Sequence, residues 1–304
     1  MDEIIKKSLE IPFDGNMKIK AGNNQKYRIS MKNDHLNRDG KIVKKQELIS
    51  TVQRTILSIP KPFLAITNFL WESVEYTDKP GNKPMRWTFA EGLNFQHSLF
   101  CTQSHEKLKK ILPDDTILSK SFPEAFGLPL LYQDLPRLPS VYLLMMQTFD
   151  VMGFETFASV ICSNAHCFDN TGEQKQLDYL SNQKVEIGVG LYSDSSFFKN
   201  GKFLCRYIGY GLYRNKLCSA FEYSCNESKV RIEDNEISSG AMRGGHSYYS
   251  GLIYLDIDTG LPVMATMLES YVAVQKNKSA DGITKIPIHV RRRVEMELIL
   301  EDAQ

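Results

Sequence analysis

The stretch 250-SGLIYLDIDTGLPVMATMLESY-271 decides the architecture of this chain. Two runs rich in tyrosine, isoleucine, valine and threonine flank Asp258-Thr259-Gly260, and such runs on either side of a glycine turn are typical of a β-hairpin. Gly260 can supply the positive φ that a tight turn requires. We therefore expect residues 247–257 and 261–274 to pair as antiparallel strands.

The same pattern continues on the C-terminal side of this hairpin. Residues 288–300 alternate apolar and charged side chains, which is typical of a strand with one buried face and one solvated face. The apolar set is Val290, Val294, Met296, Leu298 and Leu300, and the charged set is Arg291, Arg293, Glu295 and Glu297. Arg292 falls on the apolar parity, so an inward-pointing Arg292 needs a buried partner.

Two further turns are expected on the N-terminal side. Asn200-Gly201 is a strong hairpin signal, and Arg214-Asn215-Lys216 reads as a three-residue hairpin loop. That loop sets the cross-strand pairs Tyr207 with Tyr223, Gly209 with Phe221, and Cys205 with Cys225.

The first hundred residues also read as long strands, over residues 17–31, 41–59, 63–76 and 85–100. In the middle of the chain, residues 104–112 resemble a short capped helix, and a proline-rich connector follows it. Apolar residues then recur near helical spacing over residues 140–152, which predicts a buried helix packed against the sheet.

These elements predict a mainly β (α+β) fold, with a long curved antiparallel sheet, half-barrel-like, wrapped around one or two helices. We expect a single domain over residues 1–304. Its sub-units would be N-terminal strands at 1–103, a helical crossover at 104–160 and an antiparallel meander at 184–304.

Three segments carry a resemblance to a known family. They are AGNNQKYRISM (21–31), VYLLMMQTFDVMGFE (141–155) and the hairpin at 250–271. Their strand order and turn style resemble the LolA/LolB-like lipoprotein carriers, whose curved sheet shelters an apolar ligand. The resemblance implies lipid binding in a concavity. The chain departs from the envelope members in showing no leader and no lipobox cysteine, which leaves its compartment open.

Composition narrows the classes of partner. Lys and Arg number 37 against 36 Asp and Glu, and both halves of the chain are close to neutral. No broad field therefore attracts nucleic acid. The longest apolar run, residues 141–146, is too short for a transmembrane segment. We expect a soluble protein. The absent signal peptide favours the cytoplasm, and a removed leader would place it in the periplasm. The oligomeric state stays open.

Four short motifs were weighed as sites of chemistry. Asp258-Thr259-Gly260 resembles the catalytic sequence of aspartic proteases, but no second copy supplies the partner carboxylate. Cys162, His166 and Cys167 are metal-type ligands without a second pair at zinc spacing. The glycine-rich segment 238–246 precedes a strand rather than a helix, and the basic run 291–293 alternates faces. We therefore interpret residues 258–260 as a turn and the Cys162–Cys167 segment as a loop. We interpret residues 238–246 as a flexible connection and residues 291–293 as a solvated edge. No cofactor or metal is predicted.

The aromatic residues of the meander form the candidate binding face. Its members are predicted to share one face and to combine an apolar wall with polar tips: Tyr207, Phe221, Tyr223, Tyr254, Glu269 and Tyr271. The same pattern describes an ordinary core. Our leading hypothesis is a non-catalytic protein that binds an apolar or lipid-like ligand, or a protein partner, in the concavity. The alternatives are a hydrolase-like enzyme, using Cys162 or Cys167 with His166, and a structural assembly module.

Overall fold

The computed structural model describes residues 15, 18–61, 64–78, 82–100, 141–168, 171–187, 193, 195–233, 241–279 and 282–300. One long helix, α5 (Val141–Ser163), and a short 3₁₀ turn, η1 (Ala165–Cys167), accompany the strands. The strands are β1 (Asn24–Leu36), β2 (Ile42–Lys61), β3 (Leu64–Thr77), β4 (Met85–Phe100), β5 (Gln174–Gln176), β6 (Lys184–Glu186), β7 (Phe197–Lys199), β8 (Lys202–Tyr213), β9 (Lys216–Glu233), β10 (Met242–Asp256), β11 (Pro262–Ser279) and β12 (Gly282–Leu298).

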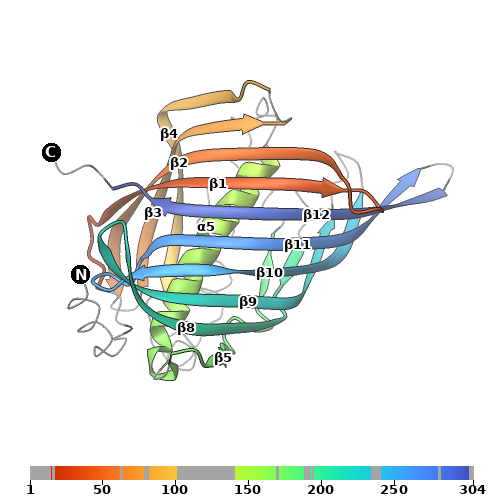
Figure 1. The fold of residues 1–304 in the computed structure, drawn as a ribbon. Coiled ribbons are helices and arrows are strands. Elements are labelled where there is room, and N and C mark those ends of the chain that lie inside the picture. Colours follow the sequence, from red (N-terminus) through yellow and green to blue (C-terminus); the bar gives the residue numbers. More distant parts are fainter. Residues whose placement is uncertain are drawn as a thin grey trace.

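The strands form one curved, open antiparallel sheet with helix α5 against its concave face (Figure 1). The 12-stranded sheet has the order β4-β3-β2-β1-β12-β11-β10-β9-β7-β6, while β8 pairs with β9 and β5. The predicted fold class is therefore confirmed. Because β1 pairs with β12, the N-terminal strands and the C-terminal meander meet in the middle of the sheet.

Alternation along the strands determines which side chains face the helix. On β1 the odd-numbered Tyr27, Ile29 and Met31 are buried, and on β12 the even-numbered Val294 and Met296 are buried. The hairpin across Asp258-Thr259-Gly260 is confirmed, with Gly260 at φ 72°. Period-2 patterns were sufficient to find these elements because one side of each strand packs on the core.

Helix α5 continues eleven residues past its predicted end at residue 152. Most of its side chains are buried, both before and after that position. A helix that is enclosed on most sides lacks the polar face that marks a boundary in sequence, and tertiary packing overrides the weak propensities of Gly153 and Thr156.

The predicted register between β8 and β9 is wrong by two residues. Tyr207 pairs with Phe221, and Cys205 pairs with Tyr223, whereas Cys225 lies opposite Phe203. The turn contains two residues rather than three, because Arg214 (φ 46°) and Asn215 (φ 64°) both adopt the left-handed conformation of a type I′ turn. A bulge before Gly209 shifts the pairing by one more residue.

The predicted hairpin at Asn200-Gly201 is also wrong. The flanking strands β7 and β8 do not pair with each other, because both pair with β9 as successive segments along one edge. Asn200 is buried, and its side chain donates to the carbonyl of Leu180 at 2.9 Å. Gly201 lies so close to the Asn226 carbonyl that a Cβ would be 1.8 Å from its oxygen. These two residues therefore join collinear strands rather than reverse the chain.

The domain boundaries stay a prediction. Residues 104–140, which include the predicted short helix and the proline-rich connector, lie outside the described residues.

Candidate functional site

Helix α5 carries three long polar side chains into the interior. Gln147, Asp150 and Glu155 are 0%, 8% and 2% exposed, in a helix that is otherwise largely apolar. A buried carboxylate needs a countercharge or hydrogen-bond donors to be tolerated. Each of these side chains reaches polar groups on the concave face of the sheet, so the helix is attached by specific polar contacts as well as by apolar packing.

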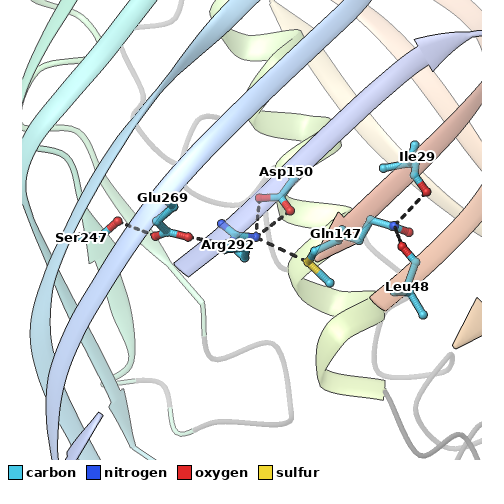
Figure 2. A network of polar contacts seen from close by, with 8 residues as sticks. Ile29, Leu48, Gln147, Asp150, Ser247, Glu269 and Arg292 are labelled. Carbon is cyan, nitrogen blue, oxygen red and sulfur yellow. Dashed lines mark hydrogen bonds and ion pairs between the residues drawn. The ribbon is translucent and has the colours of Figure 1, made fainter. Parts of the chain in front are cut away.

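The main polar feature is the Arg292 cluster, which we define as Arg292, Asp150, Glu269 and Ser247 (Figure 2). Arg292 on β12 donates from Nη1 to both carboxylate oxygens of Asp150, at 2.8 and 2.7 Å, and from Nε to Glu269 Oε2 at 2.5 Å. Ser247 on β10 donates to the other oxygen of Glu269, and Arg292 Nη1 also contacts Met31 Sδ at 3.8 Å. One guanidinium thus joins the helix to the sheet through two carboxylates.

This cluster contains more buried acid than base. Burial, opposed by Arg292 and assisted by the charge of Glu269, raises the pKa of Asp150 to about 6. Burial lowers the pKa of Arg292, but the two carboxylates more than compensate, so it lies above its ordinary value and the guanidinium stays charged. With both acids ionised, the cluster has one net negative charge.

A second polar contact attaches the other side of the helix. Arg54 on β2 forms a buried ion pair with Glu155, and its Nη1 donates to Gln25 Oε1 at 3.3 Å. Burial raises the pKa of Glu155 although Arg54 lowers it. Four residues earlier on β2, Ser50 forms a separate bond to the helix and donates to Gln147 Oε1 at 2.5 Å. The Arg54–Glu155 pair contains one base and one acid, so its formal charge is zero.

Two buried polar atoms beside the Arg292 cluster have no hydrogen-bond partner among the residues that the structure describes. They are the hydroxyl of Tyr271 and Oδ1 of Asn33. Tyr271 lies two residues beyond Glu269 on the same face of β11, and burial raises its pKa to about 12. Asn33 is 3% exposed and is the direct cross-strand neighbour of Arg292. Unfilled hydrogen-bonding capacity at buried atoms is rare and calls for an explanation.

The inner face of the sheet becomes progressively more open beyond these atoms. Val290, which pairs with Tyr271, and Ile288 are half-buried, and Ile286 is 42% exposed. All three share the parity of Arg292 on β12, so they extend one apolar strip from the cluster. Figure 1 shows β11 and β12 continuing past helix α5 in this direction. The cluster therefore lies at the border between the packed core and an apolar wall.

The structure distributes the six predicted binding residues over three environments. Tyr207 and Phe221 pack ring to ring at 5.0 Å, and Tyr223 packs on Phe157 of the helix at 5.1 Å, so these three belong to the closed core. The hydroxyl of Tyr223 donates to the Thr266 carbonyl at 2.6 Å.

The remaining three predicted residues separate. On β10 the buried apolar residues are odd-numbered, so Tyr254 points to the opposite, outer face. Its ring packs at 5.8 Å on that of Tyr213, whose hydroxyl donates to Glu297 on the outer face. Glu269 and Tyr271 lie together on the inner face beside Arg292. Of the predicted set, these two belong to the border site.

The other motifs do not assemble into a second site. Cys162 is buried with Sγ 3.8 Å from the Gly260 carbonyl oxygen, Cys167 is half-buried, and His166 is exposed. Within the described part of the chain, no three His, Cys, Asp or Glu side chains are grouped to hold a metal. Residues 238–240 lie outside the described residues, and residues 242–246 begin β10. Arg291 and Arg293 are exposed.

Sequence reasoning missed Asp150, Ser247 and Asn33. A single acid inside the apolar run 141–152 was the available signal for Asp150, because a charge in a buried helix requires a partner. Arg292, which has the parity of the apolar residues of its strand, was the corresponding signal for the partner of Asp150. Ser247 and Asn33 carried no signal, since their role depends on the strand register.

No protein-family model matches the chain, and no curated protein matches it. A solved structure described as AttH, from Nitrosomonas europaea, is 8% identical, and the match covers 95% of this chain and 97% of that one. Its TM-score of 0.16 is too low to support any argument about fold or function. None of the helices in the described ranges is long and apolar enough to cross a membrane.

Proposed function

We propose that this protein is a non-catalytic binder of an amphipathic, lipid-like small molecule, held on the concave face beside the Arg292 cluster. The observation that carries the proposal is the position of the Tyr271 hydroxyl and Asn33 Oδ1, two buried and unpartnered atoms on either side of the Arg292–Glu269 ion pair. Leaving such groups unpaired destabilises a fold. A ligand head group that bonds to them would recover that loss.

The adjacent apolar wall accounts for the rest of the ligand. Val290, Ile288 and Ile286 continue from the cluster along β12, and Ala273 on β11 pairs with Ile288. Ligand sites typically combine such an apolar surface with a few convergent polar groups. The resemblance to carriers with a curved sheet agrees with this arrangement.

Copurification and direct binding test the proposal. We expect native mass spectrometry of the gently purified protein to show a bound small molecule, and organic extraction to release it. We also expect isothermal titration calorimetry to detect binding of decanol, a neutral ten-carbon amphiphile. Absence of a copurifying molecule together with absence of decanol binding would overturn the proposal.

A matched pair of variants locates the ligand. Ile288→Asp places a charge on the inner wall, and it should weaken decanol binding by about tenfold or more, since one tenfold step corresponds to ~1.4 kcal/mol. Val274→Asp is the control, because Val274 is 42% exposed on the outer face of the neighbouring strand. Equal affinities in the two variants would contradict binding at the inner wall.

A further inference from the structure

We infer that the polar head of the ligand is a cation of the ammonium type, which binds beside the Arg292 cluster. This inference rests on the proposed function and adds the chemical class of the head group. Three features of the described residues carry it: the charge count of the cluster, the kind of free hydrogen-bonding atom beside it, and the burial of both.

Among the residues that the structure describes, the charge count leaves one carboxylate of the cluster without an ion-pair partner of its own. Asp150 and Glu269 are both buried, and both form their ion pair with the same guanidinium. The phenol of Tyr223 is also in electrostatic contact with Asp150, and it is neutral because burial holds its pKa well above the ordinary value. Arg243 lowers the pKa of Tyr271 more than Glu269 raises it, but Arg243 is not among the groups that shift the pKa of Asp150, and its Nε donates to Gln275 at 2.8 Å. A bound cation would supply the countercharge.

The free atoms at the site are those that an ammonium group can use. Oδ1 of Asn33 is an acceptor, and the Tyr271 hydroxyl oxygen can accept as well. An ammonium has three N–H donors and no acceptor. The acceptors on the two flanks of the cluster and the surplus charge between them therefore match one chemical group.

The two other common head groups match less well. A hydroxyl would bond to the free atoms but leave the surplus charge in place. A carboxylate would add a third acid beside Asp150 and Glu269, which share the Arg292 guanidinium, and like charges at low dielectric repel strongly. The site thus ranks the three head groups as ammonium first, hydroxyl second and carboxylate last.

Calorimetry with three ligands of equal chain length tests this ranking on the full-length protein at pH 7.5. We expect decylamine to bind at least about tenfold more tightly than decanol, and decanoate to bind more weakly than decanol. Equal binding of decylamine and decanol, or tighter binding of decanoate, overturns the ammonium inference while the proposed function stands. Failure of all three ligands overturns the proposed function itself.

A charge-neutralising variant assigns the preference to the cluster. Asp150→Asn removes the surplus charge, so the decylamine-to-decanol affinity ratio should fall to about one. Asp34→Asn removes a carboxylate that lies 3.9 Å from Arg291 Nη2 at the partly exposed surface, and it should keep the wild-type ratio. A ratio that survives Asp150→Asn, or that falls equally in both variants, contradicts the assignment.

Proton release gives a second readout that needs no variant. Near pH 6 a part of the Asp150 population is protonated, and a cation beside it favours the ionised form. Decylamine binding at pH 6 should therefore release a fraction of a proton, measured as the dependence of the apparent binding enthalpy on the ionisation enthalpy of the buffer. Decanol should release none. Equal proton release by both ligands would overturn the inference.

Discussion

Two buried ion-pair contacts attach helix α5 to the sheet, and they differ in charge balance. Arg54 and Glu155 form a pair of one base and one acid on the β2 side. On the β12 side, Arg292 serves two acids, Asp150 and Glu269, and unpartnered polar atoms flank it. Both contacts hold buried atoms without a hydrogen-bond partner among the described residues, and in the first contact these are Arg54 Nη2 and Glu155 Oε2. Only the second contact has a surplus charge, which a bound cation can balance. This difference in charge is the reason that we propose the second contact, and not the first, as the binding site.

The largest difference should appear when the arginines are removed. Arg54→Leu leaves Glu155 buried without its cation and should lower the free energy of unfolding by about 3–5 kcal/mol. The double variant Arg54→Leu/Glu155→Leu should return close to the wild-type value, because a well-packed apolar pair replaces a buried ion pair at little cost. Chemical denaturation measures both.

Replacing a base and an acid by two leucines should not restore stability at the Arg292 cluster. Arg292→Leu/Asp150→Leu still leaves Glu269 buried without a cation, so the double variant should stay destabilised by several kcal/mol. Full recovery in this double variant would show that the two contacts are equivalent and that the surplus charge has no energetic consequence.

The pH dependence of stability should come next in size. The pKa of Asp150 is raised by burial to about 6 from an ordinary value of 3.8, so the folded state binds a proton more tightly than the unfolded state. The stabilisation from this proton is fully present below the ordinary value and is lost as the pH rises through about 6. It amounts to about 3 kcal/mol between those limits.

Denaturation series from pH 4 to pH 7.5 check this sign. The free energy of unfolding of the wild type, relative to that of Asp150→Asn, should decrease as the pH rises. Most of this decrease should occur below about pH 7. A difference that does not vary with pH, or one that grows in favour of the wild type, would show that burial does not raise the pKa of Asp150.

Removing Ser247 from the Arg292 cluster, or Ser50 from its separate bond to Gln147, should give a smaller contrast. Ser247→Ala takes a donor from the Glu269 carboxyl group and should destabilise by about 2 kcal/mol, while Ser50→Ala removes a bond to the amide of Gln147 and should cost about 1 kcal/mol. Thermal and denaturant unfolding of the two variants in parallel measure the contrast. Equal losses would indicate that Glu269 does not depend on its donor more than Gln147 does.

The smallest stability effect belongs to Tyr271→Phe. This change deletes a buried hydroxyl that has no partner, so the free energy of unfolding should stay within about 0.5 kcal/mol of wild type or rise slightly. The same variant should weaken decylamine binding by about fivefold. A stability loss with unchanged affinity would mean that the hydroxyl serves the fold rather than the ligand.

The sequence predicted the sheet better than it predicted the site. The alternation that includes Val294 and Met296 identifies a strand because it repeats every two residues. The turn at Gly260 marks the end of a strand because it depends on a local backbone conformation. The register of β8 on β9 was wrong, since a two-residue turn with Arg214 and Asn215 at positive φ, neither of them glycine, is not encoded by the usual Asn-Gly signal.

The site could be predicted only in part for a related reason. Glu269 and Tyr271 came from the parity of β11, and Arg292 was recognised as a residue in need of a partner. Its meeting with Asp150 joins positions 142 residues apart in the chain. Such a contact depends on how the helix crosses the sheet, and that angle is set by packing rather than by any local pattern.

The most direct test of the central claim is a crystal structure of the intact protein with decylamine. We expect the amine nitrogen at about 3 Å from Asn33 Oδ1, the Tyr271 hydroxyl or the Glu269 carboxylate, with the alkyl chain along Val290 and Ile288. Decylamine bound elsewhere, with the Arg292 cluster and the adjacent wall covered only by the protein's own side chains, would contradict the claim.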